Sequence, residues 1–187
     1  MTFLFVHLPD GTYDAAIDAA LADSDSRLVD GAADRVMEGA LTSGRSWLAA
    51  YDDAGAARAA AERLADVLAD AGDAAALLIE GNGAALSPAE TVYLVANHTV
   101  TDADRFRPYI ADVARVTAMF SGRFLARAGR TESVAGAIEA GRSVILAFAD
   151  RAAAERFYAA PEYAPLLELR LATTRPNMFL VPAVENN

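Results

Sequence analysis

The fold is decided by the stretch Gly39-Ala-Leu-Thr-Ser-Gly-Arg-Ser-Trp-Leu-Ala-Ala-Tyr-Asp-Asp53, which recurs 97 residues later as Gly136-Ala-Ile-Glu-Ala-Gly-Arg-Ser-Val-Ile-Leu-Ala-Phe-Ala-Asp150. Seven positions are identical between the two copies, among them a Gly-Arg-Ser triplet and the final Asp. Each copy leads into a segment that is rich in alanine and arginine and has helical spacing. Because these residues recur at a fixed spacing, the match predicts a tandem duplication of one structural unit.

Both halves predict the same order of strands and helices around these copies. In the first half we expect strands at residues 3–8, 27–36, 47–51 and 76–79, with helices capped by Asp10 or Thr12 and by Asp53. In the second half we expect strands at residues 92–97, 123–128, 144–148 and 178–181, with helices capped by Thr101 and Asp150. Pro161 interrupts the last helix. The order in each half is βαββαβ, which is typical of a ferredoxin-like unit.

This order predicts an α+β fold made of two tandem ferredoxin-like repeats. We place one repeat at residues 1–80, a linker at 81–91 and the second repeat at 92–187. A four-stranded antiparallel sheet with helices on one face leaves its other face open, so the two sheets would cover each other as a single-chain, pseudo-dimeric α/β barrel. Residues 88–187 alone would then self-associate, because the open face would be exposed to water.

The composition excludes several kinds of partner. The formal net charge is −10 and the sequence pI is about 4.6, so the surface repels phosphate backbones and anionic lipid headgroups. No apolar run is long enough to span a membrane, and the N-terminal run is too short for a secretory signal. We therefore expect a cytoplasmic protein that binds a small-molecule ligand and neither nucleic acid nor membrane. A homodimer of pseudo-dimers is the further assembly that we consider.

The sequence also lacks the motifs of common cofactor and metal chemistry. It has no Cys, no glycine-rich phosphate loop after a strand, no Gly-x-Ser-x-Gly and no His-Glu-x-x-His. We therefore expect neither an organic cofactor nor a bound metal ion, although the two histidines leave haem ligation open.

The two histidines, His7 and His98, are the first candidates for acid–base chemistry. Both fall near the end of the first strand of their half, and aligning the strands puts them at corresponding places. A symmetric pair that faces the interior would act as acid and base near neutral pH. The alternative is that each lies at a strand–loop junction without a chemical role. Asn97 precedes His98, so strand alternation lets only one of these two side chains line a cavity.

Arg45 and Arg142 recur in the repeated Gly-Arg-Ser. A guanidinium at a strand edge holds a carboxylate or enolate oxygen through two parallel hydrogen bonds, whereas the alternative is an ion pair with a neighbouring acid. Tyr109, on the first helix of the second half, is a further candidate for proton transfer. We predict His98, Arg142 and Tyr109 as catalytic residues, and the ligand-binding residues as His7, Arg45, Asn97, Arg123 and Tyr163.

Other residues have a structural role that we favour over a chemical one. Glu162 and Arg170 lie eight residues apart on an expected helix and would form an ion pair. Trp47 and Val144, which occupy the same position in the two copies, are expected to pack in the core.

The second half resembles the domain-of-unknown-function 1330 family over roughly residues 92–182. The resemblance rests on four elements and two single residues of this sequence: Tyr93-Leu-Val-Ala-Asn-His-Thr-Val-Thr-Asp102, Ser121-Gly-Arg-Phe-Leu-Ala-Arg-Ala-Gly129, Arg142-Ser-Val-Ile-Leu-Ala-Phe148, Phe157-Tyr-Ala-Ala-Pro-Glu-Tyr163, Leu167 and Arg170. The resemblance implies the dimeric α/β barrel fold, whose members include cofactor-free monooxygenases, polyketide cyclases, lactone isomerases and haem-handling enzymes. The sequence departs from the family pattern at Ala147, where an acidic residue is common.

Two functions are consistent with these observations. The first is a small-molecule enzyme without an organic cofactor, of the isomerase, cyclase or monooxygenase type, that acts in a cavity between the two sheets. The alternative is a non-catalytic small-molecule-binding or scaffold protein. A third interpretation treats the first half only as a cover for the sheet of the second.

Overall fold

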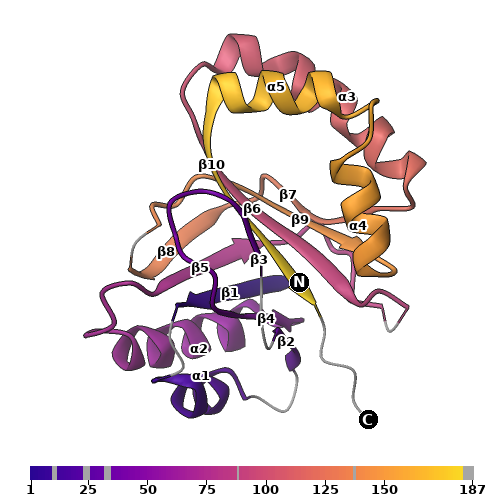
Figure 1. The fold of residues 1–187 in the computed structure, drawn as a ribbon. Coiled ribbons are helices and arrows are strands. Elements are labelled where there is room, and N and C mark those ends of the chain that lie inside the picture. Colours follow the sequence, from indigo (N-terminus) through magenta and orange to yellow (C-terminus); the bar gives the residue numbers. More distant parts are fainter. Residues whose placement is uncertain (10–11, 23–25, 32–34, 88, 137, 183–187) are drawn as a thin grey trace.

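Two five-stranded antiparallel sheets lie face to face, with helices on their outer faces (Figure 1). The structure is a computed structural model that describes residues 1–9, 12–22, 26–31, 35–87, 89–136 and 138–182. The sheet of the first half is covered by two helices, and the sheet of the second half by three. None of the helices within these ranges is long and apolar enough to cross a membrane.

The first half follows the predicted order with one extra strand. Its elements are β1 (Thr2–Leu8), α1 (Asp14–Leu21), β2 (Ser26–Gly31), β3 (Arg35–Glu38), β4 (Arg45–Tyr51), α2 (Ala54–Val67) and β5 (Ala75–Glu80). The segment expected as one strand at 27–36 is therefore two strands. Helix α1 has no side-chain cap, since Tyr13 is its N-cap residue, and Asp10 lies outside the described residues.

The second half repeats this arrangement. Its elements are β6 (Val92–Val100), α3 (Ala103–Met119), β7 (Arg123–Arg127), β8 (Thr131–Gly136), β9 (Arg142–Phe148), α4 (Arg151–Tyr158), α5 (Ala164–Thr173) and β10 (Thr174–Pro182). Asp102, rather than Thr101, caps α3 by accepting a hydrogen bond from the Arg105 amide. Pro161 lies between α4 and α5, as expected for a residue that interrupts a helix.

The extra strands are exchanged between the two sheets. The strand orders are β2-β4-β1-β5-β8 and β3-β10-β6-β9-β7. Four strands of each sheet have the ferredoxin-like arrangement, and the fifth strand comes from the other half. The prediction of two four-stranded sheets was wrong in this respect. The α+β pseudo-dimeric barrel is confirmed, whereas the boundaries at residues 80 and 92 stay a prediction.

Side-chain alternation divides the interior into three apolar layers. Phe5 and Leu77 of the first sheet and Val95 and Phe179 of the second belong to one buried cluster, which fills the space between the sheets. The opposite face of the first sheet packs on α1 and α2, and that of the second on α3, α4 and α5. The residues described between the sheets therefore form a packed core.

The repeated glycines have the same structural roles in both halves. Gly39 and Gly136 both have positive φ values, of 114° and 80°, which residues with a side chain rarely adopt. A Cβ at Gly44 would lie 2.2 Å from the Leu8 carbonyl oxygen, and one at Gly141 would lie 2.6 Å from that of His98. The repeated Asp53 and Asp150 likewise cap α2 and α4. The identical residues therefore have corresponding local roles in the two halves, while a common origin by duplication stays a prediction.

A buried ion pair joins the two halves. Glu38, on β3, accepts two hydrogen bonds from the Arg170 guanidinium on α5, one of them at 2.6 Å, and a third from the Tyr158 hydroxyl. The side chains are only 8% and 0% exposed. Arg170 therefore does not pair with Glu162, which lies before α5, and that prediction was wrong. Burial by itself would raise the pKa of Glu38, but the hydrogen bonds and charge of Arg170 lower it overall.

Replacing Glu38 by Gln should lower the free energy of unfolding by about 3–5 kcal/mol, because Arg170 would remain buried without a countercharge. Since the folded-state pKa of Glu38 is lowered, the stabilisation from this pair is complete above the ordinary pKa of about 4.5 and lost as the pH falls below it. Urea unfolding between pH 7 and pH 3 measures both effects. Asp104→Asn, which breaks an ion pair between two exposed side chains, is the matched control and should change stability little.

Candidate functional site

A small pocket lies between the outer face of the second sheet and helix α3. We call it the α3 pocket, and its lining residues are His98, Tyr109, Ile110, Val113, Phe124, Arg127, Arg142, Val144 and Leu146. It contains about 20 Å³ of space, which is enough for one water molecule. All three residues that the sequence predicts as catalytic therefore meet in one pocket.

The location differs from the predicted one. We expected a site between the two sheets, but that space holds a packed cluster, and the predicted residues lie on the helix-covered face. Strand alternation explains the difference. Val95 faces the other sheet, whereas Ala96 and His98 face the helices.

His98 lines the pocket and is 1% exposed. Its Nδ1 atom is buried and has no hydrogen-bond partner among the described residues. Burial, with a contribution from the positive charge of Arg170, lowers the pKa of the imidazole to about 3. His98 is therefore neutral at physiological pH, and one of its ring nitrogens is buried without a hydrogen-bond partner among the described residues.

Tyr109 connects the pocket to the buried ion pair. It is 8% exposed and stacks on Phe106 at a centroid distance of 4.9 Å. Burial and the neighbouring Tyr163 raise the pKa of Tyr109 well above its usual value, so its hydroxyl stays protonated. The Tyr163 hydroxyl in turn accepts a hydrogen bond from Arg170 Nε at 3.2 Å. The predicted ligand-binding residue Tyr163 thus lies behind the pocket lining and orients Arg170.

Arg142 supplies a positive charge at the pocket. None of the described acidic residues forms an ion pair with it, in contrast to the arginines of α3. Arg127 lines the same pocket, and burial, followed by the positive charge of Arg127, lowers the pKa of Arg142. Arg127 donates to the Ile110 carbonyl oxygen at 2.8 Å and lies over the Phe124 ring. The pocket therefore has two cations and no carboxylate in its lining.

Arg45, the counterpart of Arg142, has a different environment. Its Nη1 atom forms an ion pair with Asp14 Oδ2 of α1 at 2.6 Å, and its guanidinium lies 4.9 Å from the centre of the Trp47 ring. Arg45 therefore forms an ion pair with a neighbouring acid, which was the alternative that we considered for the repeated arginines.

His7 corresponds in position to Asn97 and not to His98. His7 is opposite Ser46 in the sheet and Asn97 is opposite Ser143, the equivalent serine. His7 Nε2 donates to the Thr42 carbonyl oxygen at 2.9 Å, and Asn97 Nδ2 donates to that of Glu139 at 2.8 Å. His7 thus holds the turn before β4, and Asn97 holds the turn before β9. The prediction that His7 and His98 form a symmetric pair is therefore wrong, because His98 lies one residue beyond the position that corresponds to His7.

Arg123 holds the connection between the halves. Its guanidinium binds both carboxylate oxygens of Glu90, with Nε at 2.7 Å, and the Ala85 carbonyl oxygen at 2.7 Å. These contacts raise the pKa of Arg123, chiefly through the hydrogen bonds with Glu90. Arg123 is not among the residues that line the α3 pocket.

Sequence reasoning missed Phe124 and Arg127 as pocket residues. Strict alternation puts residues 124 and 127 on opposite faces, but the β7–β9 register shifts between Phe124 and Ala126. As a result Phe124 is opposite Leu146 and Arg127 is opposite Val144, both on the helix-covered face. The place of Arg127 in the family-like element Ser121–Gly129 was the one available signal.

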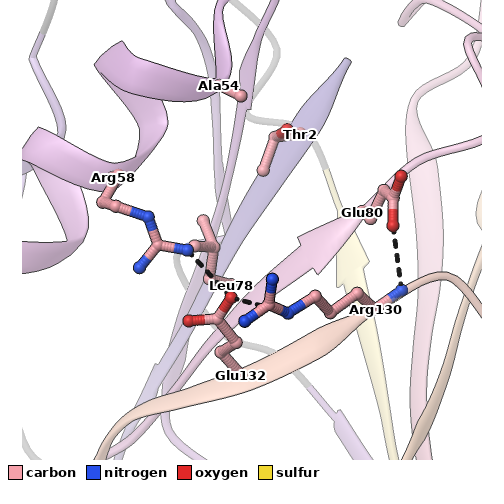
Figure 2. Close-up of a pocket in the computed structure, with 7 residues that line it drawn as sticks. All are labelled: Thr2, Ala54, Arg58, Leu78, Glu80, Arg130 and Glu132. Atoms are coloured by element: carbon pink, nitrogen blue, oxygen red, sulfur yellow. Dashed lines mark hydrogen bonds and ion pairs between the residues drawn. The ribbon is translucent and has the colours of Figure 1, made fainter.

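A second, larger hollow of about 240 Å³ lies where β8 adjoins β5 (Figure 2). Its charged side chains pair with one another: Glu132 Oε1 lies 2.8 Å from Arg58 and 3.1 Å from Arg130. Since these arginines are 52% and 76% exposed, the pairs are solvent-screened. No group of three metal-ligating side chains occurs in the described part of the chain.

The low pKa of His98 predicts a pH-dependent stability. In the unfolded chain the imidazole has an ordinary pKa of about 6.5, whereas in the folded chain it stays neutral down to about pH 3. The unfolded state therefore gains a proton first, and stability falls as the pH drops below 6.5, by about 1.4 kcal/mol per pH unit.

Between pH 6.5 and 5 the loss should be about 2 kcal/mol, and His98→Gln should remove it. Urea unfolding at the two pH values measures the difference. An equal pH dependence in the variant would show that His98 is protonated in the folded protein.

Comparisons with known proteins agree with this architecture. Over residues 91–184 the chain matches the family model "Domain of unknown function (DUF1330)". No curated protein matches the sequence.

Two solved structures resemble almost the whole chain. One, a major regulator of staphylococcal pathogenesis, has 13% sequence identity and a TM-score of 0.50, with 96% of this chain and 98% of that one covered. The other, an anthrone oxidase-like protein, has 13% identity and a TM-score of 0.55, with 98% and 91% covered. At this identity the likeness shows the fold alone. The match over residues 91–184 shows that the chain belongs to the domain-of-unknown-function 1330 family.

Proposed function

We propose that this protein is a small-molecule enzyme that works without an organic cofactor and that its site is the α3 pocket. The observation that carries this proposal is the meeting of His98, Tyr109 and Arg142 in one apolar pocket. His98 offers an unpartnered ring nitrogen, Tyr109 a protonated hydroxyl and Arg142 a cation without an acidic partner. Together they supply a proton acceptor, a hydrogen-bond donor and a charge that stabilises an oxyanion.

The pocket lining indicates the kind of substrate. Val113, Phe124, Val144 and Leu146 give it apolar walls, so the body of the substrate is apolar. The two arginines favour a group that carries or develops negative charge on oxygen. An apolar molecule with a phenolic hydroxyl or an enolisable carbonyl meets both conditions.

The three groups divide the work of forming an enolate. Arg142 holds the substrate oxygen through its guanidinium hydrogen bonds, and the Tyr109 hydroxyl donates to the same oxygen. As negative charge develops on that oxygen, it raises the pKa of His98, which then accepts the proton from the substrate carbon. From the enolate, isomerisation or cyclisation proceeds without a cofactor, and addition of molecular oxygen leads to a monooxygenase reaction.

Anthrone, which the name of one similar structure contains, is a concrete probe for the oxidative branch. Oxidation of its CH₂ group to a carbonyl removes four electrons, which molecular oxygen accepts. One oxygen atom becomes the new carbonyl of anthraquinone and the other leaves as water. Because the pocket has only about 20 Å³ of space, a ring system of this size enters only when lining side chains move aside.

A non-catalytic binding protein is the second candidate. Two observations favour it: the small enclosed volume, and the pKa of about 3 that makes His98 a weak base in the ligand-free protein. This candidate shares the site and the ligand chemistry but not the turnover.

Arg142→Met and His98→Gln should each lower kcat/KM for anthrone oxidation about 100-fold, because one removes the oxyanion partner and the other the proton acceptor. Oxygen uptake and quinone absorbance measure the rate. Arg58→Met, on the far side of the molecule in α2, is the control and should keep the full rate.

Full activity in both variants would exclude the α3 pocket as the active site. Binding of phenols and enolisable ketones that Arg142→Met weakens, with no turnover of any of them, would support the binding protein instead.

A further inference from the structure

The first half contains the counterpart of the α3 pocket in a filled form. In the first sheet Leu8 is opposite Arg45 and Val6 is opposite Trp47. In the second sheet His98 is opposite Arg142 and Ala96 is opposite Val144. Trp47 therefore occupies, on the helix-covered face of its sheet, the position that Val144 occupies beside the α3 pocket.

The side chains that fill this counterpart form a connected set. The Trp47 ring is fully buried, lies under the Arg45 guanidinium at 4.9 Å, and donates from Nε1 to Asp18 Oδ1 at 2.8 Å. The carboxylate of Asp14 pairs with Arg45 at 2.6 Å. An aromatic ring and a carboxylate, both from the chain itself, thus surround the guanidinium.

The α3 pocket has neither of these groups. Val144 replaces the indole, and no described carboxylate takes the place of Asp14 beside Arg142. The acids of α3 are used on the helix itself: Asp104 pairs with Arg107 at 2.8 Å and Asp112 with Arg115 at 3.8 Å. None of these residues therefore supplies an aromatic or acidic partner to the Arg142 guanidinium. The pocket beside it has about 20 Å³ of space, so a ring enters only when lining side chains move aside.

We propose that the α3 pocket binds an aromatic acid, and that Trp47 and Asp14 occupy in the first half the places that the ring and the anionic group of this ligand take in the second. The ring lies over Val144 below the Arg142 guanidinium, and the carboxylate pairs with Arg142. A positively charged guanidinium attracts both an aromatic face and an anion, so one ligand satisfies both interactions. This inference rests on the proposed site and adds the ligand class to it.

Indole-3-acetate, which carries the ring of Trp47 and the carboxylate of Asp14, is the probe. Titration calorimetry on the full chain should show one site. Arg142→Met should weaken binding roughly 30-fold or more, because the anion loses its partner. Tryptamine, with the same ring and a positive charge, should not bind, and Arg58→Met should bind as the unaltered chain does.

Val144→Trp tests the correspondence between the two halves directly. The introduced indole should fill the α3 pocket as Trp47 fills its counterpart and abolish indole-3-acetate binding while the protein stays folded. Unchanged affinity in this variant, or in Arg142→Met, would overturn the proposal.

The reverse change, Trp47→Val combined with Asp14→Asn, should open the filled counterpart and raise the stoichiometry from one to two. Because the loss of a buried tryptophan is destabilising, the thermal midpoint is measured as well, and indole-3-acetate should raise it more than in the unaltered chain. A folded double variant with one site would overturn the correspondence.

Turnover of anthrone without binding of aromatic acids would overturn the ligand class alone, whereas binding without turnover would overturn the enzyme proposal alone.

Discussion

The buried pair between Glu38 and Arg170 fastens the exchanged strand β3 of the first half to helix α5 of the second. Strand β3, which carries Glu38, belongs by sequence to the first half but pairs with β10 of the second. Removing both charges from water is expensive, and the cost is offset here by a bidentate contact and by the hydroxyls of Tyr158 and Tyr163. The pair therefore forms only when the exchanged strand is in place, which couples closure of the barrel to the packing of α5.

The same pair also sets the electrostatics of the candidate site. Arg170 lowers and Glu38 raises the pKa of His98, while Tyr163 links Arg170 to Tyr109. His98 is neutral chiefly because it is buried, and the neighbouring pair carries no net charge that would reverse this effect. The first half thus contributes a carboxylate to the surroundings of a pocket whose lining belongs to the second half.

The strand and cap patterns of both halves, with the repeated segment, predicted the βαββαβ order, and the glycines and aspartates of that segment have local roles in turns and helix caps. The exchange of β3 and β8 between the sheets depends on tertiary contacts. No local sequence pattern at Thr131–Gly136 distinguishes this strand from a loop. The grouping of His98, Tyr109 and Arg142 was predicted from residue type, but the face of the sheet was not. Matching His7 with His98 by identity gave a wrong register, whereas matching Ser46 with Ser143 gives the right one.

The two halves differ most where a ligand site and a stable core place opposite demands on the same position. In the first half Trp47 fills the space below its helix and every polar atom of its ring has a partner, which favours stability. Each half has one buried polar atom without a partner among the described residues, Asp14 Oδ1 in the first and His98 Nδ1 in the second, so this cost of about 1–3 kcal/mol is common to both. In the second half a pocket also replaces packed side chains, which costs packing energy. Two identical subunits would carry this cost twice. A single chain with two unlike halves can restrict the cost of a pocket to one half. Joining the halves in one chain therefore allows Trp47 to fill the core of the first half while Val144 leaves the pocket in the second.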